Sequence, residues 1–237
     1  MIDLTKIKAL SFDCYGTLID WETGLKTVLN AWAEDRGVAA RDDQLLESFG
    51  RFEVAVQAAA PAMLYSNVLR EVLRLMADDA GVAAGEAWQE RLARSIGAWP
   101  PFPDSAEALI KLRRHYQLAI LSNVDRMSFH GSSAQLLSGF DLVVTAEDVG
   151  SYKPDARNFE ALIGRLAEIG VGRGEFLHVA QSLHHDHAPA AKIGIASIWI
   201  NRRHGKSGPG ATPAVEGRSV HAKEFASLRD FADWACA

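Results

Sequence analysis

Lys8-Ala9-Leu10-Ser11-Phe12-Asp13-Cys14-Tyr15-Gly16-Thr17-Leu18-Ile19-Asp20 is the stretch that decides the fold of this 237-residue chain. Its apolar part has the length of a short β-strand and stops at Asp13, and a Tyr-Gly-Thr turn follows at once. Open α/β sheets present reactive groups in this way, because their sites lie at the carboxyl ends of the strands. An aspartate that caps a helix is the alternative for this segment alone.

The composition is that of a globular chain with a substantial core. Hydrophobic residues make up 48% of the sequence and the formal net charge is −5, which predicts one large domain or two modest ones. We expect neither nucleic acid nor membrane as a partner, since there is no basic stripe and no apolar run of roughly 18 residues. Cys14 and Cys236 cannot form a disulfide framework, and no signal peptide is recognisable, so a cytoplasmic location is expected.

A long helical segment follows the first strand. Apolar residues recur at helical spacing, and this predicts helices over 22–37, 45–59, 65–79 and 86–96. No strand pattern interrupts them. We therefore expect an inserted all-helical domain over residues 21–97, and a second domain formed by residues 1–20 and 98–237.

The second half of the chain alternates strands and helices, as a parallel sheet requires. Trp99-Pro100-Pro101-Phe102-Pro103 predicts a stiff hinge, because each proline fixes its own φ. A long loop is predicted over 202–217, which is rich in glycine, proline and charge. Strands are predicted over 117–122, 142–145, 176–180 and 196–200, and helices over 104–113, 126–137, 156–168, 185–193 and 225–235. The predicted fold class is α/β, with a Rossmann-like, mostly parallel sheet.

Polar side chains follow four of the predicted strands. Asp13 ends the first, Ser122 and Asn123 end the second, and the next two strands lead to Lys153 and Asp186. Because the carboxyl ends of parallel strands share one edge of a sheet, these groups can converge although they are far apart in sequence.

These segments resemble the four motifs of the haloacid dehalogenase superfamily. In order, they are Phe12-Asp13-Cys14-Tyr15-Gly16-Thr17-Leu18, Leu121-Ser122-Asn123, Tyr152-Lys153-Pro154-Asp155 and the late acidic motif at Asp186. The resemblance covers nearly the whole chain and implies a Rossmann-like core with a helical cap, the segment 21–97. It also implies that Asp13 is the nucleophile, since a carboxylate stripped of water at a strand end can attack carbon or phosphorus.

Tyr15 favours one branch of the superfamily. The superfamily's phosphatases carry a second aspartate at this position, as general acid and base for the leaving alkoxide. A tyrosine here is similar to the L-2-haloacid dehalogenases, whose leaving halide needs no proton. A magnesium-dependent phosphatase, with Asp13 and Asp186 as ligands, is thus an alternative that Tyr15 disfavours, and only that alternative needs a metal cofactor.

The resemblance assigns roles to the other motif residues. Lys153 would pair with the nucleophile and keep it ionised, because a nearby cation lowers a carboxylate pKa. Thr17, Ser122 and Asn123 would orient the nucleophile and hold the substrate carboxylate, and Asp186 would anchor Lys153 or activate water. The plainer alternatives are a helix-cap hydroxyl at Ser122 and a solvated surface lysine at position 153.

The last motif departs from the family. Gln181 and Leu183 stand where such dehalogenases carry serine and asparagine, and Phe159 stands where they carry tyrosine. Since those family groups orient the hydrolytic water, Gln181 and His184 become candidates for the site. The histidines around Asp186 lack the companion spacing of a metal finger, so no metal site is predicted.

Two residues of the cap are further substrate-binding candidates. Arg51 lies where resembling dehalogenases place an arginine that cradles the halide or the substrate carboxylate; the alternative is a surface arginine. Trp21 could form an apolar wall beside the leaving group, or simply pack in the core.

The sequence therefore predicts a hydrolase that acts at C2 of small 2-substituted carboxylic acids, foremost 2-haloacids. Asp13 would displace the leaving group from the opposite side, and water would cleave the aspartyl ester at the aspartate carbonyl, so that the substrate carbon is inverted once. No cofactor is expected, and by resemblance the chain could form a homodimer.

Two further rivals remain open besides the phosphatase. Ring opening of L-azetidine-2-carboxylate would use the same covalent mechanism, with Tyr15, Asp20 or a histidine of the last motif protonating the amine. A non-catalytic binding module on the same scaffold belongs to a different class.

Overall fold

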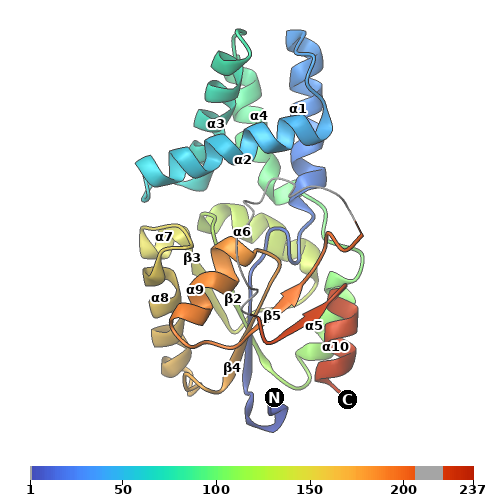
Figure 1. Ribbon diagram of the computed structural model, residues 1–237, viewed down its shortest axis with the longest axis vertical. Coiled ribbons are helices and arrows are strands. Elements are labelled where there is room, and N and C mark those ends of the chain that lie inside the picture. Colours follow the sequence, from blue (N-terminus) through green and yellow to red (C-terminus); the bar gives the residue numbers. More distant parts are fainter. Residues whose placement is uncertain (1, 206–220) are drawn as a thin grey trace.

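A parallel sheet organises the chain, and the computed structural model describes it for residues 2–205 and 221–237 (Figure 1). The strand order is β3-β2-β1-β4-β5-β6, and every neighbouring pair is parallel. The strands are β1 (Ala9–Phe12), β2 (Gln117–Ser122), β3 (Leu142–Thr145), β4 (Phe176–Ala180), β5 (Ser197–Ile200) and β6 (Lys223–Phe225). The order reverses at β1, so the residues that follow β1 lie where ligands bind in such sheets.

Helices cover both faces of the sheet, because the central strands are buried on both sides. Leu10, Leu118 and Leu177 belong to the core cluster that includes α5 and α10, whereas Ala9 and Ala119 belong to the cluster of α8 and α9. The helices around the sheet are α5 (Ser105–Leu112), α6 (Arg126–Ser133), α7 (Ala146–Val149), α8 (Ala156–Glu168), α9 (Ala188–Lys192) and α10 (Leu228–Ala235). Short turns of other helix types are η1 (Leu4–Lys6), η2 (Ile96–Ala98), η3 (Ala134–Leu136) and η4 (Leu183–His187).

The cap consists of four helices, which lie together beyond the sheet at the end opposite both termini (Figure 1). They are α1 (Trp21–Arg36), α2 (Asp42–Ala59), α3 (Tyr65–Asp79) and α4 (Glu86–Ser95). Asp20 caps α1 by accepting a hydrogen bond from the Thr23 amide at 3.2 Å, and Gly37 ends it at a φ of 69°. The helical character of this segment agrees with the sequence, while the exact domain boundaries stay a prediction. Over the described ranges, no helix has the length and apolar character needed to cross a membrane.

The sequence missed one element at the edge of the sheet. Phe225 was expected to begin the last helix, but it ends strand β6, and α10 begins after the cap Ser227. The ring of Phe225 packs against Phe231 and Trp234 of α10, with centroids 5.7 and 5.5 Å away. The strand was missed because its three residues are too few to show the alternating pattern of a strand. Most of the loop predicted over 202–217 lies outside the described residues.

Trp99 joins the cap to the core. Its side chain is buried, its Nε1 donates to Ser95 Oγ at 3.0 Å, and its ring meets Tyr15 edge-on at 5.7 Å. Helix α1 passes so close to Trp99 that only a glycine fits at position 24: a Cβ there would lie 2.2 Å from Cδ1 of the indole.

We therefore predict that Gly24→Ala is destabilising, by about 1–3 kcal/mol, because the indole must shift within a packed core. Urea denaturation measures this. Gly164→Ala on α8 is the matched control, since its added methyl meets no atom within 4 Å. It should stabilise by about 0.5–1 kcal/mol through helix propensity. Equal effects at the two sites would contradict the close contact.

Candidate active site

The turn after β1 aims Asp13 at the edge of the sheet. Leu18 and Ile19 donate their amides to Cys14 O at 2.7 and 3.0 Å, and Gly16 adopts a φ of 93°, which disfavours a side chain. The hydroxyl of Thr17 donates to Asp13 Oδ2 at 2.7 Å. It also accepts the amide of Gln181 at 2.9 Å. Thr17 therefore connects the first motif to the last one.

Lys153 lies between two carboxylates at the centre of the site. Its ammonium donates to Asp13 Oδ1 at 2.9 Å, to Asp186 Oδ1 at 2.7 Å and to Leu121 O at 2.9 Å, which uses all of its N–H groups. The lysine side chain is only 1% exposed. The structure thus brings together Asp13, Lys153 and Asp186 as the sequence predicted, and position 153 is not a surface lysine.

Burial and mutual attraction compete in this cluster. Burial disfavours the ammonium, but the two carboxylates outweigh it and raise the pKa of Lys153. Burial likewise opposes the ionisation of Asp186, yet Lys153 and a hydrogen bond from His178 hold the pKa of Asp186 below its ordinary value. For Asp13, burial prevails over Lys153 and raises the pKa. Asp186 is therefore the permanent counter-ion of Lys153, and Asp13 is the less stabilised, more reactive carboxylate.

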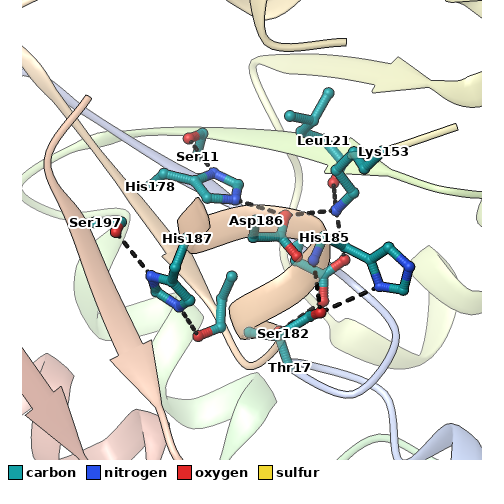
Figure 2. A network of polar contacts seen from close by, with 12 residues as sticks. Ser11, Thr17, Leu121, Lys153, His178, Ser182, His185, Asp186, His187 and Ser197 are labelled. Atoms are coloured by element: carbon teal, nitrogen blue, oxygen red, sulfur yellow. Dashed lines mark hydrogen bonds and ion pairs between the residues drawn. The ribbon is translucent and has the colours of Figure 1, made fainter. Parts of the chain in front are cut away.

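His178 supports Asp186 from within the sheet, as Figure 2 shows. Its Nε2 lies 2.9 Å from Asp186 Oδ1 and its Nδ1 lies 2.9 Å from Ser11 Oγ. Since a carboxylate only accepts, Nε2 carries a proton. Phe159, noted above as a departure from the family, packs edge-on against this ring at 5.0 Å. The sequence interpretation missed His178, although a single histidine in an apolar strand was a usable signal.

The last motif forms a π-helical turn, η4, with Ser182 as its cap. Ser182 Oγ accepts the amide of His185 at 3.0 Å and lies 3.1 Å from His185 Nδ1. His187 is tied to Ser197 and to Ala180 O within the core (Figure 2). Burial lowers the pKa of His185 to about 4, and likewise that of His187, so both imidazoles are neutral at physiological pH.

A small cavity of about 50 Å³ lies between core and cap at this cluster. The core contributes Asp13, Tyr15, Ser122, Asn123, Val124, Lys153, Gln181, Ser182, His185 and Asp186. The cap contributes Trp21, Glu53, Gln57 and Tyr65. Within the described ranges, no three His, Cys, Asp or Glu side chains are grouped as metal ligands would be.

Most of the predicted substrate-binding residues line this cavity. Ser122 Oγ is buried and has no hydrogen-bond partner among the described residues, so it is available to a ligand. Asn123 is committed instead: its amide group exchanges hydrogen bonds of 3.0 and 2.7 Å with the main chain of Lys153. The Tyr15 hydroxyl lies 2.8 Å from Ser132 Oγ, and burial raises the pKa of Tyr15 well above its ordinary value.

Two of the predicted substrate-binding residues do not line the cavity. Arg51 is 60% exposed and forms an ion pair with Asp79 at 2.8 Å. The reason is helical geometry, since positions 49 and 53 of α2 are buried and residue 51 lies on the opposite face. His184 is also displaced: its ring rests on His185 at 4.9 Å, and it is His185 that lines the cavity.

Glu53 is the functional candidate that the sequence interpretation missed. It accepts a hydrogen bond from the Tyr65 hydroxyl at 2.7 Å and is only 6% exposed. Burial, partly offset by Tyr65, raises the pKa of Glu53 to about 7. A usable signal existed, because Glu53 follows Phe49 at i+4 and so interrupts the apolar stripe of α2.

The family follows from comparison with known proteins. A family model for haloacid dehalogenase-like hydrolases matches residues 7–194. The chain belongs to the haloacid dehalogenase-like hydrolase family. It is 31% identical to the (S)-2-haloacid dehalogenase of Pseudomonas sp. (strain YL) over 204 residues, which cover 83% of each chain.

The chain is also similar to a phosphatase and to a dehalogenase of known structure. A phosphoserine phosphatase of Thermus thermophilus is 29% identical over 189 residues, covering 77% of this chain and 72% of the relative. The crystal structure of the L-2-haloacid dehalogenase from Xanthobacter autotrophicus with chloropropionic acid covalently bound superposes with a TM-score of 0.77 at 21% identity. It covers 96% of this chain and 97% of its own, and confirms the predicted α/β core with a helical insertion.

For this hydrolase we predict that Lys153→Met costs about 3–5 kcal/mol at neutral pH, because it leaves two buried carboxylates without their cation. Both carboxyls would then gain protons at higher pH than in the unfolded chain, so the loss should be smaller near about pH 5 than at neutral pH. Urea denaturation at both pH values measures it. Lys111→Met removes an exposed ion pair with Asp233 and should cost less than about 1 kcal/mol. A loss at Lys153 as small as that would contradict the buried cluster.

A second stability prediction concerns Glu53. The native state keeps a proton that the unfolded chain loses between the ordinary pKa of 4.5 and about 7, so stability falls as the pH rises through this interval. Glu53→Gln avoids this loss and should raise the free energy of unfolding by about 2–3 kcal/mol at alkaline pH, with little difference in acid. Thermal unfolding against pH measures it, with the exposed Glu47→Gln on the same helix as control. A pH-independent difference would contradict the raised pKa.

Proposed function

We propose that the protein is an L-2-haloacid dehalogenase that hydrolyses small 2-haloacids through an aspartyl ester. The observation that carries the proposal is the buried Asp13, held by Lys153 and Thr17 at the floor of a cavity that the cap encloses. Tyr15 stands where a phosphatase needs its second aspartate. The (S)-2-haloacid dehalogenase relatives support the same activity.

The first half of the reaction forms the ester. One oxygen of Asp13 attacks C2 of the substrate from the side opposite the halogen, the C–halogen bond breaks, and the halide leaves with the electron pair. Lys153 favours the ionised form of Asp13 against the effect of burial, while Thr17 fixes its orientation. Ser122, whose Oγ has no partner among the described residues, is the group we propose for the substrate carboxylate.

The second half cleaves the ester. Water adds to the carbonyl carbon of Asp13, and the bond from that carbon to the ester oxygen breaks. One proton of the water passes to this oxygen, so the 2-hydroxyacid leaves with inverted configuration, and the other is released as Asp13 returns to its carboxylate form. Asp186 lines the cavity, and its buried Oδ2 accepts no hydrogen bond from the described residues. We propose it as the acceptor that holds this water. Gln181 and His185 line the same cavity and complete the surroundings of the water.

The rivals lack the groups they were expected to use. For ring opening of an amine, Tyr15 is a poor acid because its pKa is raised, and His185 is neutral. Asp20 is occupied as the cap of α1, bound to Thr23, and does not line the cavity. For the phosphatase, no second aspartate follows Asp13.

We also propose that the enzyme works without a metal ion, in the cytoplasm, on free small carboxylic acids. Its homodimeric assembly is a proposal by resemblance alone. The domain limits 1–20 with 98–237, and 21–97, belong to the same set of proposals.

The test offers the purified protein L- and D-2-chloropropionate in EDTA and measures chloride release. We expect turnover of the L-enantiomer to D-lactate, and a fall of at least about 1,000-fold in Asp13→Asn. The exposed Asp233→Asn on α10 is the matched control and should retain activity. Turnover of p-nitrophenyl phosphate only with magnesium, or chloride release that survives Asp13→Asn, would refute the proposal.

A further inference from the structure

The cavity is short of positive charge for an enzyme whose substrate is an anion. Among its described lining residues, Lys153 is the only lysine or arginine. The N–H groups of that ammonium are already committed to Asp13, Asp186 and Leu121. Arg51, the cation expected from the cap, lies on the surface beside Asp79. A substrate carboxylate must therefore be bound by neutral donors.

The cap supplies an acid at this place. Glu53 reaches the cavity from α2, and the Tyr65 hydroxyl from α3 donates to its Oε1 at 2.7 Å. Its second oxygen, Oε2, has no hydrogen-bond partner among the described residues. Gln57, one turn further along α2, lines the cavity as well. When Glu53 is protonated, Oε2 is a donor without a protein acceptor; when it is ionised, it is a third carboxylate facing the substrate.

Glu53 is also a cavity group whose charge changes near neutral pH. Burial raises its pKa to about 7. The neighbouring phenols Tyr65, Tyr152 and Tyr15 have pKa values raised above their ordinary ones and stay neutral. Other titratable or charged groups around it are Asp13, Lys153 and Asp186 of the core cluster, His185 with a pKa of about 4, and Asp125, which accepts the amide of Ser66 at the start of α3.

We propose that protonated Glu53 is the cap's binding group for the substrate carboxylate, to which it donates a hydrogen bond through Oε2, while Ser122 of the core lines the same cavity. The ionised form repels the same carboxylate. Glu53 is then a specificity-determining residue that admits anionic 2-substituted acids only in its neutral state. This inference rests on the proposed function, because it takes the substrate to be such an acid.

Linkage makes the proposal quantitative. If the anion binds the protonated form more tightly than the ionised form, then the bound anion must raise the proton affinity of Glu53 by the ratio of the two binding affinities. The apparent KM then rises by about tenfold per pH unit above the pKa of the free enzyme, and substrate binding at alkaline pH takes up a proton. The maximal rate stays constant, since the bound complex remains protonated.

The first experiment needs no variant. Calorimetric titration of the wild-type enzyme with L-lactate, an unreactive analogue of the substrate, is run near about pH 8 in two buffers of different ionisation enthalpy. We expect an uptake of close to one proton per L-lactate bound near about pH 8, falling toward zero near about pH 6. Binding without proton uptake at both pH values would overturn the proposal.

Three variants then locate the proton. Chloride release from L-2-chloropropionate is measured from about pH 6 to about pH 8.5, where the wild-type KM should rise by about tenfold or more. Glu53→Gln keeps an acceptor for Tyr65 and a neutral donor, so its KM should be independent of pH. Tyr65→Phe removes the bond that lowers the pKa of Glu53, so its rise in KM should move to higher pH. Glu47→Gln, exposed on the same helix, should match the wild type.

The outcomes separate the possibilities. Chloride release with a flat wild-type KM, or a Glu53→Gln profile that equals the wild type, would overturn the role of Glu53 and leave the proposed function standing. A pH dependence confined to kcat would place Glu53 in the chemical step and likewise overturn its binding role. Absence of chloride release from the wild type at every pH would overturn the proposed function, and this inference with it.

Discussion

The ammonium of Lys153, enclosed between Asp13 and Asp186, is the interaction on which the rest of the site depends. Buried charges persist only when they are paired and hydrogen-bonded, and here each partner is fixed by a different strand end. Asn123 holds the main chain of Lys153, Thr17 holds Asp13, and His178 holds Asp186. The cluster therefore joins the ends of β1, β2 and β4 to the segment after β3, and its charges act on the pKa of Asp13 at the same time.

The cap completes what the core cannot provide alone. The core supplies Asp13, Lys153 and the Ser122 hydroxyl, which has no partner in the described part of the chain, and α2 and α3 cover them with Glu53, Gln57 and Tyr65. Closure removes water and strengthens every charge interaction inside. The same closure buries the acid Glu53, which lies in the apolar stripe of α2. Glu53 lowers stability above its ordinary pKa, which is a typical compromise between stability and function at a binding site.

Sequence patterns predicted the elements of the core well, because buried parallel strands and amphipathic helices have distinct periods. They predicted Asp13, Thr17, Ser122 and Lys153 at the site, since each follows a strand end within a specific motif. The structure places Arg51 and His184 outside the lining of the cavity. In both cases the residue type was right for the chemistry, but one or two positions along a helical turn decided which side chain faces the cavity.

By itself the sequence determined the family, most of the strands and helices in their order, and Asp13 and Lys153 as residues that meet at the strand ends, because local periodicity and short motifs carry that information. Only the tertiary structure decided which residues of the cap meet the core. That depends on the packing of α1 on Trp99 and on the rotation of α2, which no local pattern encodes. The tertiary structure also decided the pKa of Glu53, since burial by other parts of the chain raises it to about 7.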